Sequence, residues 1–293
     1  MSEKQWDGTT YGNGLMHRWL IGILRRIDVR CVYIFANVFV VPPCLFRPGF
    51  KFIYRYFRKC YHESLLRAFW HTYQNHCLFA QVVIDKFAMY AGKSFDIRIE
   101  GHEHWLRLAG QEAGFVQLSS HMGNYEIAGY SLKAETKPFN AIVFFGEKAS
   151  VMENRNRLFA HTNIRMIPIR EDMSHMFEID RALCDGEIVS IPGDRIWGSK
   201  KVLTRTFLGR EAQFPMGPFT VAAMRGLDVL AVNVMKTATR QYTIYVTPLP
   251  YDKTASRRQQ AEQLLKGYVA ELERQLSRYP TQWYNYFDFW KDE

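Results

Sequence analysis

Apolar runs alternate with helix-like patterns along the chain from about residue 63 onward. The short apolar runs that predict buried strands are residues 115–118, 141–145, 164–169, 188–191, 229–236 and 242–248. The helices predicted between and after them are residues 103–110, 147–159, 173–184 and 257–276. Alternation of this kind is typical of α/β proteins. We therefore predict a central, mostly parallel sheet flanked by helices, in a domain of residues 61–293.

The start of this domain is predicted to be helical. Apolar residues recur at roughly helical spacing over residues 63–91, and Gly92 is a candidate for the helix C-cap. Residues 95–100 then alternate between apolar and polar, as in a half-buried strand. The long helix is expected to pack over the sheet.

The first 60 residues have a different pattern, in which basic and apolar residues are mixed. Residues 15–27 predict a basic amphipathic helix, and residues 31–46 are almost wholly apolar. A membrane-spanning helix needs roughly 20 apolar residues, and Pro42-Pro43 would interrupt one here. We therefore predict a re-entrant or interface-lying hairpin, with a buried core helix as the alternative. The basic, aromatic residues 51–58 favour the membrane interface, so residues 1–60 are interpreted as a membrane-associating helical segment.

Composition limits which partners the protein is expected to bind and in which compartment it is expected to lie. The formal charge of +9 favours an anionic partner. Because no zinc-finger or RNA-recognition pattern accompanies it, we expect anionic membrane lipids and no nucleic acid. The five cysteines include no Cys-x-x-Cys pair, which predicts neither a disulfide framework nor a metal site. The polar, glycine-rich start does not resemble a signal peptide, so the catalytic domain is expected in the cytoplasm.

The strongest candidate for chemistry follows the strand at 115–118. There a turn of small residues brings His121 to the carboxyl end of the strand, where ligands bind in open α/β sheets. If Gly123 and Asn124 open a helix, Glu126 lies about one turn along it and can fix the tautomer of the imidazole. Such a pair makes a general base. A surface histidine in a loop is the alternative, and the absence of Gly-x-Ser-x-Gly argues against an α/β-hydrolase.

A second strand end is predicted to reach the same rim. The strand at 188–191 ends at Pro192-Gly193 and delivers Asp194 and Arg195. Gly217 stands at a predicted helix start, where glycine lets a substrate approach the backbone.

These residues carry a resemblance to a known family. His121-x4-Glu126 resembles the His-x4-Asp/Glu signature of the lysophospholipid acyltransferase superfamily, and residues 119–126 resemble its lipid A late acyltransferase branch. Residues 207–223 and the Pro-x-Gln-Trp stretch at 280–283 resemble later blocks of the same branch. The match covers about residues 100–290 well, but Gly193-Asp194-Arg195 departs from the usual Asp-Gln-Asp pattern.

The resemblance implies an enzyme that transfers a fatty acyl chain to a hydroxyl or amine of a lipid or glycolipid at the cytoplasmic face of the inner membrane. The donor would be a thioester of acyl carrier protein or coenzyme A, with His121 as base and Glu126 as its partner. No cofactor and no metal are expected. The residues expected to bind substrate are Asn124, Arg155, Arg157, Asp194, Arg195 and Gly217.

Other interpretations stay open from the sequence. The helix that carries Arg155 and Arg157 has a solvated basic face as its alternative. The same dyad acting on water would make a thioesterase. A basic protein that only binds membranes or nucleic acid is the non-catalytic alternative.

Overall fold

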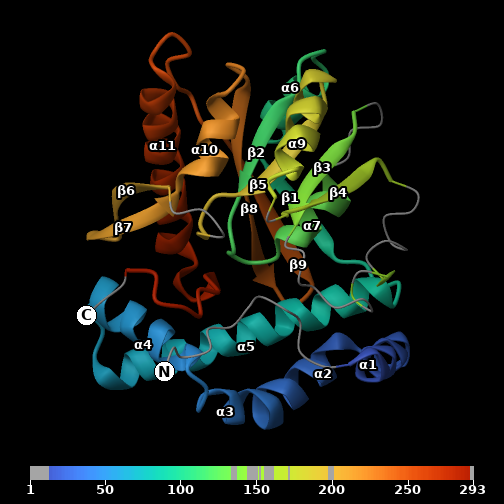
Figure 1. Cartoon of the computed structure of the whole chain (residues 1–293). Coiled ribbons are helices and arrows are strands. Elements are labelled where there is room, and N and C mark those ends of the chain that lie inside the picture. Colours follow the sequence, from blue (N-terminus) through green and yellow to red (C-terminus); the bar gives the residue numbers. More distant parts are fainter. Residues whose placement is uncertain are drawn as a thin grey trace.

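The computed structural model describes residues 13–132, 137–143, 151, 153–154, 162–170, 172–196 and 201–290. Within these residues a seven-stranded sheet has the order β1-β9-β8-β2-β5-β3-β4 (Figure 1). Its strands are β1 (Asp96–Glu100), β2 (Phe115–Ser119), β3 (Phe139–Val143), β4 (Ile164–Pro168), β5 (Ile188–Pro192), β8 (Asp228–Ala238) and β9 (Gln241–Pro248). Strands β8 and β9 are antiparallel, and all other neighbours are parallel. The predicted α/β class with a mostly parallel sheet is confirmed.

Each face of the sheet is covered by helices. Successive side chains of a strand point to opposite faces, and all five residues of β2 are buried. Val116 and Leu118 of β2 belong to one core cluster with residues of α9 (His175–Cys184), α10 (Met216–Ala223) and α11 (Arg257–Arg278). Phe115 belongs to another, with residues of α6 (His102–Ala109) and α7 (Tyr125–Ser131). A separate hairpin of β6 (Val202–Phe207) and β7 (Arg210–Pro215) leads directly into α10.

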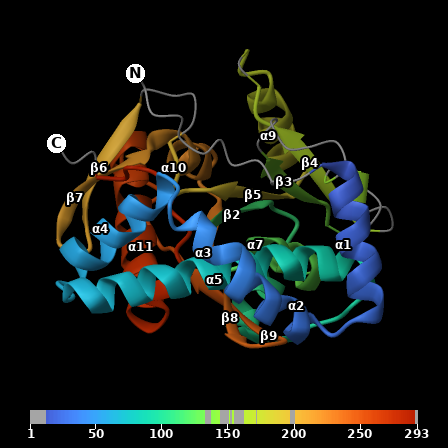
Figure 2. The same cartoon turned by 90° about the horizontal axis from the view of Figure 1, so that it is seen from below.

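The amino-terminal helices form a layer below the sheet in Figure 1, and Figure 2 views that layer from below. They are α1 (Gly14–Arg26), α2 (Val29–Phe35), the π-helical η1 (Ala36–Val40), α3 (Val41–Cys44), α4 (Gly49–Cys60) and α5 (Leu65–Tyr90). Helix α5 confirms the predicted long helix and runs between the sheet and helices α1, α2 and α3 (Figure 1). Leu24, Tyr33 and Phe87 contribute to a small core shared by α1, α2 and α5.

The apolar run at 31–46 is helical but largely exposed. Ile34 is 66% exposed and Phe39 is 65% exposed, so the alternative of a buried core helix does not hold. Across the described ranges, no single helix is long and apolar enough to cross a membrane. Val29–Cys44 and Gly49–Cys60 together meet that test, but they are bent by 95° relative to each other. Most of the helix predicted at 147–159 lies outside the described residues.

Candidate active site

The turn after β2 holds His121 between two supports. The N–H of Asn124 donates to the carbonyl of Val234 on β8 at 2.9 Å, and the N–H of Gly123 donates to the carbonyl of Gln282 at 2.9 Å. Gly123 has a φ of +54°, and a Cβ there would lie 1.8 Å from the carbonyl oxygen of Val234. Only glycine therefore fits this position, because any side chain would push the turn off β8.

Strand register brings His121 and Asp194 together. β2 and β5 are parallel neighbours in which Ser119 is opposite Pro192. Because His121 and Asp194 each lie two residues beyond these partners, they meet at the same edge of the sheet. The N–H of Gly193 donates to the carbonyl of Ser119 at 2.9 Å and keeps the two chain segments together beyond the paired strands.

The carboxylate of Asp194 holds both the ring and the backbone of His121. Its Oδ1 lies 2.7 Å from Nδ1 of the imidazole, and its Oδ2 accepts the backbone N–H of His121 at 2.8 Å. Nε1–H of Trp283 donates to the same Oδ2 at 3.4 Å. The Asp194 side chain is 2% exposed and that of His121 is 22% exposed, so the carboxylate is sequestered while the imidazole keeps a solvent-facing portion.

The electrostatics favour a neutral imidazole beside an ionised carboxylate. Burial, reinforced by the charge of Arg195, lowers the pKa of His121, although Asp194 opposes this shift. Burial would raise the pKa of Asp194, but its attraction to His121, its hydrogen bonds with that residue and the charge of Arg195 hold it below the usual value. Because an ionised carboxylate only accepts hydrogen bonds, Nδ1 carries the proton of the imidazole. The lone pair on Nε2 is then free to accept a proton, so the imidazole can act as a general base.

The expected partnership of His121 with Glu126 needs a correction. The carboxylate at Nδ1 is that of Asp194, and Glu126 instead forms an ion pair with Lys86 of α5 at 2.8 Å. Helix α7 begins at Tyr125, after Gly123 and Asn124 and not at them, so Glu126 occupies its second position. The strand register that delivers Asp194 to Nδ1 could not be inferred from the spacing of His121 and Glu126.

The other residues predicted to bind substrate differ in how close they lie to His121. Asn124 is 3% exposed and is the residue before α7. Arg195 lies beside His121 and Asp194, where its charge lowers the pKa of His121 and its guanidinium is 5.3 Å from the ring centre of Phe287. Gly217 is the second residue of α10, and a Cβ there would meet nothing within 4 Å. Arg155 and Arg157 lie outside the described residues.

Sequence reasoning missed the carboxyl-terminal contribution to the site. The N–H of Tyr284 donates to the carbonyl of His121 at 3.1 Å, and Met122 pairs with Trp283 in an isolated antiparallel bridge. The Pro-x-Gln-Trp stretch was noted only as a family resemblance, although the aromatic tail that follows it was a usable signal of burial. In the part of the chain that the structure describes, no group of three or more His, Cys, Asp or Glu residues could hold a metal ion.

The family model described as "Bacterial lipid A biosynthesis acyltransferase" matches residues 79–292. No curated protein matches the chain. Among solved structures, the chain is similar to the 1-acyl-sn-glycerophosphate (LPA) acyltransferase PlsC from Thermotoga maritima. The identity is 14% and the TM-score is 0.42, over 91% of this chain and 99% of that one.

Proposed function

Since the chain belongs to the bacterial lipid A biosynthesis acyltransferase family, we propose that it moves a fatty acyl chain from a thioester to a lipid at the inner membrane. The donor is acyl carrier protein or coenzyme A carrying the acyl chain, and the acceptor group is a hydroxyl or an amine. The observation that carries this proposal is the pairing of His121 with Asp194 at the carboxyl edge of the sheet.

His121 acts as the general base. Its Nε2 removes the proton from the acceptor oxygen or nitrogen as that atom attacks the thioester carbonyl. The new bond to the carbonyl carbon forms, the carbon–sulfur bond then breaks, and the imidazolium returns its proton to the departing thiolate. Asp194 keeps Nδ1 protonated and stabilises the imidazolium while it exists. The protein needs no covalent intermediate.

Arg195 is placed to interact with negative charge. It lies near His121 in a partly buried position, where electrostatic interactions are stronger than in water. We assign it the oxyanion that develops at the thioester carbonyl, or an acidic group of the acceptor. Glu126 and Lys86 hold α7 against α5 beside the turn, which makes Glu126 a support for His121 in this mechanism.

The biochemical test uses the full chain with anionic vesicles that contain candidate acceptors. Acyl carrier protein and coenzyme A thioesters are compared as donors, and products are identified by mass spectrometry. An acylated lipid with one equivalent of free thiol supports the proposal. Free fatty acid without acylated lipid would indicate a thioesterase, and vesicle binding without turnover would indicate a binding protein. Comparing membrane lipids from cells with and without the gene identifies the acceptor.

The amino-terminal helices supply the surface for membrane association in this proposal. Among the described residues, most of the large apolar side chains that are exposed lie between residues 15 and 70: Leu15, Met16, Trp19, Ile23, Ile27, Ile34, Phe35, Val38, Phe39, Val40, Phe46, Leu65, Leu66, Phe69 and Trp70. Arginine and lysine residues are interspersed among them in the sequence. Exposed apolar side chains with basic neighbours fit the interface of an anionic bilayer.

Point substitutions test this surface better than removal of residues 1–60. Ile53, Tyr56 and Phe57 of α4 are buried in the same core cluster as Trp283, so that truncation would also disturb the site. Phe46 is 92% exposed, and Phe177 in the first turn of α9 is 81% exposed but lies outside residues 15–70. We expect Phe46→Ser to weaken binding to anionic vesicles about tenfold and Phe177→Ser to leave it unchanged. Equal effects of the two substitutions would exclude this surface.

A further inference from the structure

The turn of His121 is supported by two segments that are distant in sequence. One is β8, which accepts the N–H of Asn124 through Val234. The other is residues 282–284, which we call the tail strap. The tail strap accepts the N–H of Gly123 and donates to the carbonyl of His121. The turn can keep its position only if β8 and the tail strap keep a fixed distance from each other.

The side chain of Gln282 fixes that distance. Its Oε1 accepts the backbone N–H of Lys236 on β8 at 2.9 Å, and its Nε2 donates to the carbonyl of the same residue at 2.8 Å. The amide thus imitates the backbone of a neighbouring strand, which requires a donor and an acceptor on one side chain. Gln282 is 4% exposed, so water does not compete readily for these bonds.

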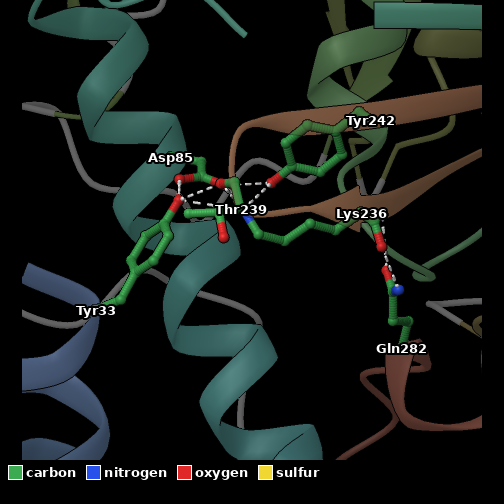
Figure 3. A network of polar contacts seen from close by, with 6 residues as sticks. All are labelled: Tyr33, Asp85, Lys236, Thr239, Tyr242 and Gln282. Atoms are coloured by element: carbon green, nitrogen blue, oxygen red, sulfur yellow. Dashed lines mark hydrogen bonds and ion pairs between the residues drawn. The ribbon is translucent and has the colours of Figure 1, made fainter. Parts of the chain in front are cut away.

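The two hydrogen bonds between Gln282 and Lys236 form a clamp, and Lys236 is itself firmly held. Nζ of Lys236 pairs with the buried carboxylate of Asp85 on α5, and it donates to the carbonyl of Thr239 at 3.1 Å. The hydroxyls of Tyr33 and Tyr242 also bond to Asp85, as Figure 3 shows. The Lys236 and Asp85 side chains are 3% and 0% exposed. A residue held at both its main chain and its side-chain end gives Gln282 a fixed point to bind.

We propose that Gln282 is a positioning residue for His121. The turn binds both β8 and the tail strap, and Gln282 binds these two segments to each other. It thereby keeps the imidazole against Asp194. This inference rests on the proposed function, because it concerns the rate of the step in which His121 acts as base. Gln282 touches no reacting atom, and its effect passes through the carbonyl of His121, the N–H of Gly123 and Trp283.

Loss of the clamp should alter turnover more than substrate binding. A displacement of about 1 Å at a catalytic group costs roughly 10²-fold in rate. Gln282→Met removes both side-chain hydrogen bonds at similar volume. We expect kcat to fall between about 10-fold and 100-fold, while KM for donor and acceptor stays within about twofold. A residue with only a structural role would reduce the amount of folded enzyme without this separation of kcat from KM.

Gln275 offers a matched control. It is 0% exposed, and its Nε2 donates to Glu271 within α11 at 2.8 Å, away from the turn. Gln275→Met should lower the melting temperature but leave kcat per folded molecule unchanged. Gln282→Glu is the second variant, because it keeps the size and the acceptor for the N–H of Lys236 but replaces the donor to the carbonyl of Lys236 with a charged oxygen. It is expected to fold and to lower kcat in the same direction as Gln282→Met.

The experiment measures kcat, KM and thermal unfolding for the wild type and all three variants of the full chain, with the same vesicles and thioester donor. A kcat loss confined to the Gln282 variants supports the inference. Normal kcat in folded Gln282→Met, or in folded Gln282→Glu if the Met variant does not fold, overturns it and leaves the proposed function intact. If neither the wild type nor Gln275→Met transfers an acyl chain, the proposed function fails and the inference fails with it.

Discussion

The turn at His121 and the segment of residues 14–60 differ in how much of each is bound to the rest of the protein. Around His121, the main-chain groups from Ser119 to Asn124 bind β8, the tail strap, Asp194 and the N–H of Gly193. Among residues 14–60, side chains such as Phe46, in the turn between α3 and α4, project from the surface with 92% exposure. A densely bonded turn holds one geometry, whereas an exposed apolar surface is available for association. Substitutions in the turn should therefore change rate, and substitutions on the helices should change binding to membranes.

The largest effect is expected from His121→Ala. It removes the base, so acyl transfer should fall by a factor on the order of 10⁴. Vesicle binding should stay the same, because the amino-terminal helices are untouched. Transfer is measured with a radiolabelled thioester, and circular dichroism confirms folding, since Asp194 loses one of its partners. Near-normal transfer by a folded His121→Ala protein would exclude this mechanism.

The next largest effect distinguishes two carboxylates. Asp194→Asn should lower kcat by about 10²–10³-fold, because the amide no longer stabilises the imidazolium or fixes its tautomer. Glu126→Gln should cost less than about tenfold, because it keeps an acceptor for Lys86 and the bond at Nδ1 stays with Asp194. The kcat values of the two variants show which carboxylate assists His121. The reverse order would return Glu126 to the role that its spacing from His121 first suggested.

Acidification should reduce activity gradually. The pKa of His121 lies below its ordinary value of 6.5, so the base form persists at neutral pH and kcat/KM falls about tenfold per pH unit only below that pKa. The unfolded chain binds this proton first, so protein stability also declines as pH falls from 6.5 through the pKa of the folded state. The pH profile of kcat/KM checks the first effect, and urea unfolding at several pH values checks the second. An acid limb centred above pH 6.5 would contradict the burial of the imidazole.

The sequence predicted the parts of the structure that depend on local patterns. The strand at Phe115–Ser119 and the helix at Leu65–Tyr90 followed from apolar spacing, and the position of His121 at a strand end followed from the turn. The partner of His121 depends instead on which strands are neighbours, because Asp194 is 73 residues away. The sequence placed Asp194 at the same rim as His121, but helical spacing, which is a local pattern, favoured Glu126 as the partner. The same limit hid Gln282, whose bonds to Lys236 span 46 residues.

The smallest effect should come from the edge of the exposed apolar surface, beyond the segment first assigned to the membrane. Leu66 lies in the first turn of α5 with 85% exposure, and Leu106 of α6 is 53% exposed near the opposite end of the sheet (Figure 1). Partial burial of one leucine contributes about 1 kcal/mol, so Leu66→Ser should weaken binding to anionic vesicles about fivefold. Leu106→Ser should not, and kcat on a donor and acceptor in detergent should be unchanged in both, since neither residue supports the turn. Sedimentation with vesicles measures the difference. If Leu66→Ser binds vesicles as tightly as the wild type while Phe46→Ser does not, the membrane-binding surface ends before α5.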